Sequence, residues 1–349
     1  MSAPAIPPPV DRGDVVVVAA PASTVDGAFP EKFELGTRRL RERFGLEVVE
    51  YPTARRSRSY LLEHPEDRAA DVVRAFAEED VRALISVIGG NDQLRILQHL
   101  DLDVLGENPT RFVGFSDNTV LCAALFEAGV VSYYGGGVLV DLGVPELHPY
   151  TERYLRRGLF ERSLGELEPA EEFTDVTGDW TDPSHLDDPR PFEAHPGRSW
   201  HGPVAPVSGT VWGGCLELVD LLLAADRCIP SRATFEDVVL ALETSEELPS
   251  PAAVRRAMLG LAERGLLDAI EGLMVGAVTA QSHRVSRDAE ERAAYRASVR
   301  EAIDEVVAWY APDLVRVYGV EFGHGAPRAP IPIGGRVELD PAAGTITFP

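Results

Sequence analysis

Three residues that together can form a nucleophilic hydrolase site lie at the ends of apolar segments. Ser116 follows the apolar run 111–115 and precedes a helical pattern, so a tight turn there would expose its hydroxyl. Glu243 closes the run VVLAL, and His324 stands between two glycines in FGHG. A serine hydroxyl is a weak nucleophile, which needs a base to take its proton and donors to stabilise the oxyanion. The chain order Ser, Glu, His is one in which such triads occur.

Each of these residues also has an ordinary structural interpretation. The segment GFSDN departs from the G-x-S-x-G elbow, because Asn118 replaces the second glycine, and a serine that caps the following helix explains Ser116 equally well. Taken alone, Glu243 is more often a loop carboxylate and His324 more often a structural histidine.

The segments around Ser116 alternate between strand and helix patterns. We expect strands at 14–20, 46–51, 81–88 and 111–115, and helices at 31–44, 65–78, 92–100 and 119–128. This alternation predicts a doubly wound α/β sheet with right-handed crossovers. Such sheets bind ligands at the carboxyl ends of their strands, where Gly90 and Ser116 are both expected.

The second half reads as mixed α+β. Strands are expected at 207–212, 238–242, 272–280 and 314–322, helices at 215–224, 251–264 and 290–307, and a β-hairpin at 336–348. Because 349 residues exceed the roughly 250–300 of a single core, two domains are expected. We place an N-terminal α/β domain at 1–165, a connecting substrate loop at 166–206 and a β-rich C-terminal domain at 207–349.

The connecting loop is acidic and rich in proline, and it holds two of the four tryptophans, Trp180 and Trp200. A solvated linker gains nothing by exposing tryptophan, so a functional loop is favoured over a disordered one.

The same loop contains several potential metal ligands, namely His185, His195, His201, Asp187 and Asp188. Their spacing fits no zinc pattern well, and we favour a solvated loop over a metal site.

Composition excludes several classes of partner. The formal charge of −23 makes nucleic acid and anionic membrane surfaces poor partners.

The three cysteines are odd in number and lie within apolar runs, which indicates buried free thiols in a reducing compartment. GGND lacks the full dinucleotide fingerprint, so a nucleotide cofactor is given little weight. No signal peptide or membrane span is apparent, so we expect a soluble, cytoplasmic protein.

Five motifs in order, IGGNDQ, GFSDNT, GGCLE, LETSEE and GVEFGHG, closely resemble the serine peptidase family of L,D-carboxypeptidases and microcin C immunity proteins. The resemblance covers nearly the whole chain. It implies a Rossmann-like or flavodoxin-like N-terminal domain, a β-rich C-terminal domain, a site at their junction and a homodimer. No metal or organic cofactor is implied.

Carried over by motif, the resemblance makes Ser116 the nucleophile, His324 the general base and then acid, and Glu243 the residue that orients His324. The backbone N–H groups of Gly90 and Asp117 are the implied oxyanion donors.

Two branches of the family differ in substrate. One releases terminal D-alanine from murein tetrapeptide, and the other cleaves a peptidyl or aminoacyl group from a modified adenylate. The chain resembles the second branch in its length, in LETSEE and in its GDWTD and RSW segments. Trp180, and less strongly Trp200, is predicted to stack on the nucleobase, with Asn91 as a further substrate contact. Cys215 departs from the asparagine that often follows the paired glycines. A non-catalytic ligand-binding protein of the same fold is the alternative from another class.

Overall fold

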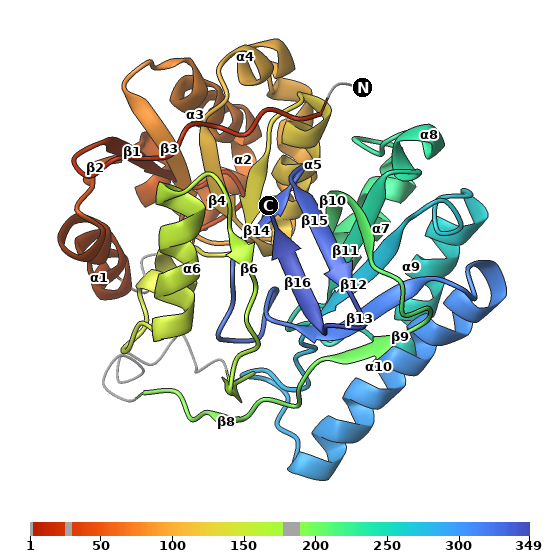
Figure 1. The fold of residues 1–349 in the computed structure, drawn as a ribbon. Coiled ribbons are helices and arrows are strands. Elements are labelled where there is room, and N and C mark those ends of the chain that lie inside the picture. The colour runs from red at the N-terminus through yellow and green to blue at the C-terminus, as the bar shows by residue number, and fades with distance from the viewer. Residues whose placement is uncertain (1–2, 25–29, 177–188) are drawn as a thin grey trace.

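The structure is a computed structural model that describes residues 3–24, 30–176 and 189–349. Two large sheets, each flanked by helices, dominate the molecule (Figure 1). A small sheet lies in the connecting segment and pairs β7 (Glu172–Phe173) with β8 (Glu193–Ala194). The predicted class, a parallel α/β domain followed by a second sheet-rich domain, is confirmed.

The first sheet has the strand order β14-β5-β4-β3-β1-β2. Its strands are β1 (Val15–Ala19), β2 (Glu47–Glu50), β3 (Val81–Ser86), β4 (Arg111–Gly114), β5 (Ser132–Tyr134) and β14 (Ile331–Ile333). The first five run parallel, whereas β14 is antiparallel to β5. The β-branched run in β1 is almost wholly buried, as expected for a strand covered on both faces.

Helices cover both faces of this sheet (Figure 1). They are α1 (Pro30–Arg39) with η1 (Leu40–Phe44), η2 (Pro52–Arg55), α2 (Arg58–Glu63), α3 (Pro65–Ala77), η3 (Gln93–His99), α4 (Leu102–Glu107), η4 (Ser116–Asn118), α5 (Thr119–Glu127), η5 (Val138–Leu142) and α6 (Pro149–Phe160). The helical segment expected at 92–100 takes the form of 3₁₀ turns in η3. Its first two N–H groups, of Asp92 and Gln93, donate to Asp117 Oδ2, so a tertiary contact anchors its start.

The second sheet has the order β6-β16-β15-β10-β11-β12-β13-β9. Its strands are β6 (Gly165–Glu166), β9 (Ser199–His201), β10 (Val207–Cys215), β11 (Val238–Glu243), β12 (Gly272–Gly276), β13 (Val315–Val320), β15 (Arg336–Asp340) and β16 (Thr345–Phe348). The four strands β10 to β13 are parallel, which the mixed α+β pattern of the sequence does not specify. The predicted C-terminal hairpin is present as β15 and β16.

Among the described residues, the helices that accompany the second sheet are α7 (Leu216–Ala225), α8 (Arg232–Phe235), α9 (Pro251–Glu263) and α10 (Ala289–Tyr310). A complete capping box between Asp288 and Glu291 starts the long helix α10. Within the described ranges no helix is both long and apolar enough to span a bilayer.

Two short strands connect the halves of the chain. β6 directly follows the expected N-terminal domain but belongs to the second sheet, and β14 lies near the C-terminus but belongs to the first. The loop from β13 to β14 therefore crosses from one sheet to the other. The exact domain limits stay a prediction.

Candidate active site

The turn after β4 holds Ser116 in a conformation that few side chains adopt. Ser116 has φ of 64°, in the left-handed region, and is the first residue of η4. For a residue other than glycine this conformation costs roughly 1–2 kcal/mol. Strain of this kind at a strand-to-helix turn is typical of a nucleophile elbow. The N-cap position of α5 is held by Asn118, so Ser116 does not cap that helix.

The structure brings Ser116, His324 and Glu243 together from three separate elements. His324 Nε2 lies 3.1 Å from Ser116 Oγ, and His324 Nδ1 lies 2.7 Å from Glu243 Oε2. Glu243 is the last residue of β11 and is buried, whereas His324 lies in the loop after β13. A hydroxyl, an imidazole and a carboxylate are thus within hydrogen-bonding distance of one another in the order that acyl transfer requires.

Tyr134 is a member of this site that the sequence analysis missed. Its hydroxyl donates to Glu243 Oε1 at 2.6 Å and accepts the backbone N–H of Ser116 at 3.0 Å. One buried phenol therefore fixes both the orienting carboxylate and the nucleophile turn. The available signal was positional, since Tyr134 ends β5 beside the end of β4.

The loop after β3 packs directly against the nucleophile turn. A Cβ added to Gly89 would stand 2.6 Å from Ser116 Cβ, and one added to Gly90 would stand 3.0 Å from Asp117 Oδ2. The structure thus places Gly90 against Asp117, the residue that follows Ser116. Their role as oxyanion donors stays a prediction.

A second carboxylate, that of Glu246, also reaches the catalytic imidazole. Glu246 Oε2 lies 3.0 Å from His324 Nε2, the nitrogen that faces Ser116. Burial would lower the pKa of His324, but the carboxylates of Glu243 and Glu246 outweigh it and raise that pKa to about 10. Although burial opposes it, His324 in turn lowers the pKa of Glu246 to about 2. These contacts favour the protonated form of the imidazole, whereas a general base must be neutral to accept a proton.

The strands and turns of the second sheet position these groups through buried polar contacts. Thr119 Oγ1 donates to the carbonyl of Ser116 at 2.7 Å and accepts the N–H of Cys215 at 3.0 Å. Glu217 Oε1 accepts both the N–H (3.0 Å) and the hydroxyl (2.5 Å) of Ser245, which fixes the turn between Glu243 and Glu246. Cys215 is buried and lies 3.3 Å from Glu217 Oε2.

With this geometry in view, comparison with known proteins identifies the family. The model of the LD-carboxypeptidase N-terminal domain matches residues 16–135, and that of the LD-carboxypeptidase C-terminal domain matches residues 208–339. The chain belongs to the LD-carboxypeptidase family. It is accordingly a serine hydrolase.

Relatives of this LD-carboxypeptidase-family chain carry names from both branches. It is 26% identical over 340 residues to a probable murein peptide carboxypeptidase of Bacillus subtilis, covering 97% of this chain and 92% of that protein. It is 24% identical over 143 residues to the microcin C7 self-immunity protein MccF of Escherichia coli, covering 41% of each. Among solved structures, an MccF-like protein from Streptococcus pneumoniae in complex with AMP matches with a TM-score of 0.84 and 25% identity, covering 97% of this chain and 99% of that one.

The predicted substrate contacts of this LD-carboxypeptidase-family chain are placed unevenly. Asn91 is exposed in the loop beside Gly90. Trp200 lies in β9, pairs with Val317 of β13 and packs partly buried against the core of the second sheet. Trp180 lies outside the described residues. The substrate contacts of all three stay predictions.

The histidines of the connecting segment do not converge where they are described. His195 forms an edge-to-face contact with Phe173, and His201 one with Tyr318, each with ring centroids 5.6 Å apart. His185, Asp187 and Asp188 lie outside the described residues. In the part of the chain that the structure describes, no group of three or more potential ligands could hold a metal ion.

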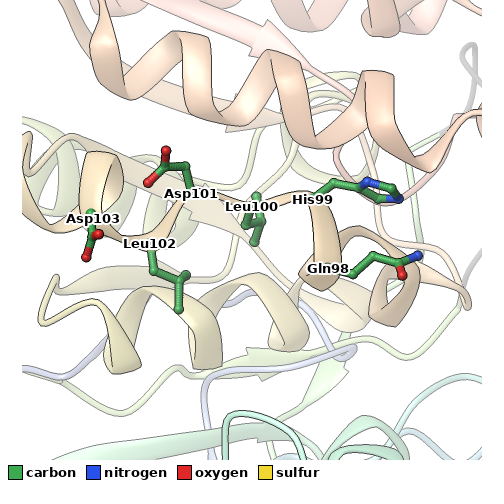
Figure 2. A pocket seen from close by; sticks show the side chains of 6 residues that line it. All are labelled: Gln98, His99, Leu100, Asp101, Leu102 and Asp103. Carbon is green, nitrogen blue, oxygen red and sulfur yellow. The ribbon is translucent and has the colours of Figure 1, made fainter.

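Hollows elsewhere among the described residues are not lined by the candidate catalytic residues. One, of about 530 Å³, is lined by residues 98–103 between η3 and α4 (Figure 2). Another, of about 310 Å³, is lined by residues of α10 together with residues of β12, β13 and the segment 196–199.

Proposed function

We propose that this serine hydrolase uses Ser116 as nucleophile, His324 as general base and then acid, and Glu243 to orient His324. The observation that carries the proposal is the hydrogen-bonded chain from Ser116 Oγ through the imidazole to Glu243. Three separate elements supply its members, and the nucleophile has the strained backbone of an elbow.

The geometry supports an acyl-enzyme route. Ser116 Oγ attacks the carbonyl carbon while His324 Nε2 takes the hydroxyl proton. The oxyanion that forms accepts hydrogen bonds from the backbone N–H groups of Gly90 and Asp117. Collapse of this intermediate expels the leaving amine, which receives the proton from His324. Water, deprotonated by the same imidazole, then releases the acyl group as a carboxylic acid.

We propose an amide-type bond in a peptidyl or aminoacyl nucleotide conjugate as the bond cleaved, as in detoxification of microcin C. The AMP complex of the Streptococcus pneumoniae neighbour and the likeness to MccF support a nucleotide-bearing substrate. The second candidate is the L,D bond of murein tetrapeptide, supported by the Bacillus subtilis relative that matches over nearly the whole chain. Both reactions are proposed for a cytoplasmic homodimer.

The catalytic proposal is tested with Ser116→Ala, and with Ser208→Ala as a matched control at an exposed serine of β10. We expect hydrolysis to fall at least about a thousandfold in Ser116→Ala and to persist in the control. A fluorophosphonate should label Ser116 of the parent, as read by mass spectrometry. Parent-like turnover by Ser116→Ala would overturn the assignment.

The substrate proposal is tested by offering aspartyl sulfamoyl adenosine and murein tetrapeptide side by side. A higher kcat/KM for the adenosine conjugate supports the proposed branch, and a higher value for the tetrapeptide supports the second candidate.

Activity should survive a chelator, whereas loss that is restored by added zinc would favour a metal-dependent hydrolase.

A further inference from the structure

Arg328 lies beside the reacting groups but has no part in the mechanism above. It follows His324 by four residues in the loop between β13 and β14, and its side chain is buried. Its guanidinium carbon lies 4.4 Å from the centre of the Phe115 ring, and Phe115 immediately precedes the nucleophile. Its Nη2 approaches the carbonyl oxygen of His324 at 3.5 Å. The cation therefore lies against the ring of the residue before Ser116 and beside the backbone of His324.

The donors of this guanidinium are poorly satisfied for a buried arginine. Among the described residues Nε and Nη1 have no hydrogen-bond acceptor. Asp141 Oδ1 lies 3.2 Å from Nε as an ion pair without hydrogen-bond geometry, and Asp141 Oδ2 also has no donor. A buried charged group left without hydrogen bonds is costly, so such an arrangement suits a group that awaits a ligand.

Arg111 shows what a structural arginine looks like in the same protein. It is equally buried, and its Nε, Nη1 and Nη2 together donate to four backbone carbonyls, those of Pro7, Pro8, Gly158 and Glu161. Arg328 has one long contact of this kind. The difference separates an arginine that ties loops together from one with donors to spare.

Charged groups of both signs surround Arg328. Burial chiefly, and then the positive charge of Arg328, lowers the pKa of Arg190 to about 10. Two carboxylates interact with these cations, Asp141 with both guanidinium groups and Glu246 with Arg328. Because Glu246 also pairs with His324, the two guanidinium groups favour a further anion beside them.

We propose that Arg328 binds a carboxylate of the substrate beside Ser116, so that the protein selects substrates with a carboxylate close to the scissile bond. The inference rests on the proposed hydrolase function. A planar guanidinium with free donors matches the two oxygens of a carboxylate, and stacking on Phe115 holds its plane in place. The carboxylate comes either from the C-terminus of the leaving group or from an acidic side chain of the acyl group.

The test uses two pairs of substrates that differ only in this carboxylate. Murein tetrapeptide is compared with its C-terminal amide, and aspartyl with asparaginyl sulfamoyl adenosine. Each pair is given to the parent, Arg328→Gln, Arg328→Lys and the control Arg336→Gln, whose arginine is partly exposed on β15. Binding is measured separately by calorimetry with each variant in a Ser116→Ala background.

We expect the parent to prefer the acid in one pair by about 10- to 100-fold in kcat/KM, the usual effect of a charge-assisted hydrogen bond. Arg328→Gln should abolish this preference by slowing the acid alone, Arg328→Lys should retain part of it, and Arg336→Gln should retain it fully. The pair that shows the effect identifies the source of the carboxylate.

Equal slowing of acid and amide by Arg328→Gln, with the preference intact, would mean a structural role and would overturn the proposal. Turnover without any preference for the acid that depends on Arg328 would overturn the subsite and leave the proposed function standing. If neither pair is hydrolysed, the proposed function is refuted. The subsite still stands in that case if calorimetry shows tighter binding of the acid and this preference is lost in Arg328→Gln. Absence of that preference in both measurements refutes the subsite.

Discussion

Glu246→Gln should make the catalytic histidine a better base at neutral pH. A general base must be neutral to accept the proton of Ser116, yet Glu246 lies 3.0 Å from the same Nε2 and helps to raise the pKa of His324 to about 10. Glutamine has nearly the same shape but no charge. Its introduction removes one of the two carboxylates that favour the imidazolium form and leaves Glu243 in place.

The size of the effect follows from the distance. An opposite charge within about 4–6 Å shifts a pKa by about 1–3 units, so the pKa of His324 should fall from about 10 to between roughly 7 and 9. At pH 7 the neutral fraction of the imidazole would rise from about 0.1% to between about 1% and 50%, using the same range of shift. The rate at which Ser116 reacts should therefore rise at that pH, by at most about 10- to 500-fold, because a less basic imidazole also takes the proton less readily.

Two measurements check this prediction without depending on the natural substrate. The rate of fluorophosphonate labelling of Ser116, followed against pH, should show its acidic limb about 1–3 units lower in the variant. An NMR titration of His324 should move by the same amount. Glu247→Gln makes the same change one residue along, at an exposed side chain, and should leave both unchanged. A limb that stays in place or moves to higher pH would refute the electrostatic interpretation of the Glu246 contact.

The same pKa shift predicts how stability depends on pH. Because the pKa of His324 is raised in the folded state, its imidazolium form stabilises the fold fully below about 6.5, and this contribution is lost as pH rises through about 10. The difference in Tm between the parent and Glu246→Gln should therefore shrink across that window. A difference that grows with pH would contradict the sign of the shift.

Two further substitutions test how the nucleophile is held. Gly89→Ala would place a Cβ 2.6 Å from that of Ser116, so kcat/KM should fall by about 100-fold or more. In the control Gly260→Ala the nearest atom to the new Cβ is 3.8 Å away, so kcat/KM should stay unchanged. Equal rates for the two alanine variants would show that the β3 loop does not constrain the nucleophile. Tyr134→Phe removes the hydroxyl that hydrogen-bonds to the Ser116 N–H and to Glu243 Oε1. We therefore expect about 1–3 kcal/mol less stability in urea unfolding and a lower kcat. Parent-like values of both would refute the bridging role.

Much of the fold and the central three residues could be predicted from the sequence because they depend on local patterns. The β-branched run in β1 and the apolar run before Ser116 indicate buried parallel strands, and the end of such a strand is where a ligand site forms. Ser116 and His324 follow strands of this kind, and Glu243 is the last residue of one. The five ordered motifs then indicated which of many serines, glutamates and histidines belong together.

The remaining members of the site leave no such local signal. Tyr134 reads as an apolar strand residue, and only the pairing of β5 with β4 brings its hydroxyl to Ser116. Glu246 is one of four polar residues that follow β11. Its contact with His324 depends on a turn that Glu217 of helix α7 holds by hydrogen bonds. Arg328 is one of many arginines, and its unsatisfied donors are visible only once its neighbours are placed.

The loop that carries His324 shows how the two halves of the chain make one site. It leaves β13 in the second sheet and enters β14 in the first, so both of its ends are fixed by different sheets. Glu243 reaches the loop from the second sheet and Ser116 reaches it from the first, while Tyr134 of the first sheet donates to Glu243. The contact between Thr119 and Cys215 joins the same two bodies a few residues away. The distance between His324 and Ser116 is therefore a property of the junction between the sheets, because neither sheet holds both residues by itself.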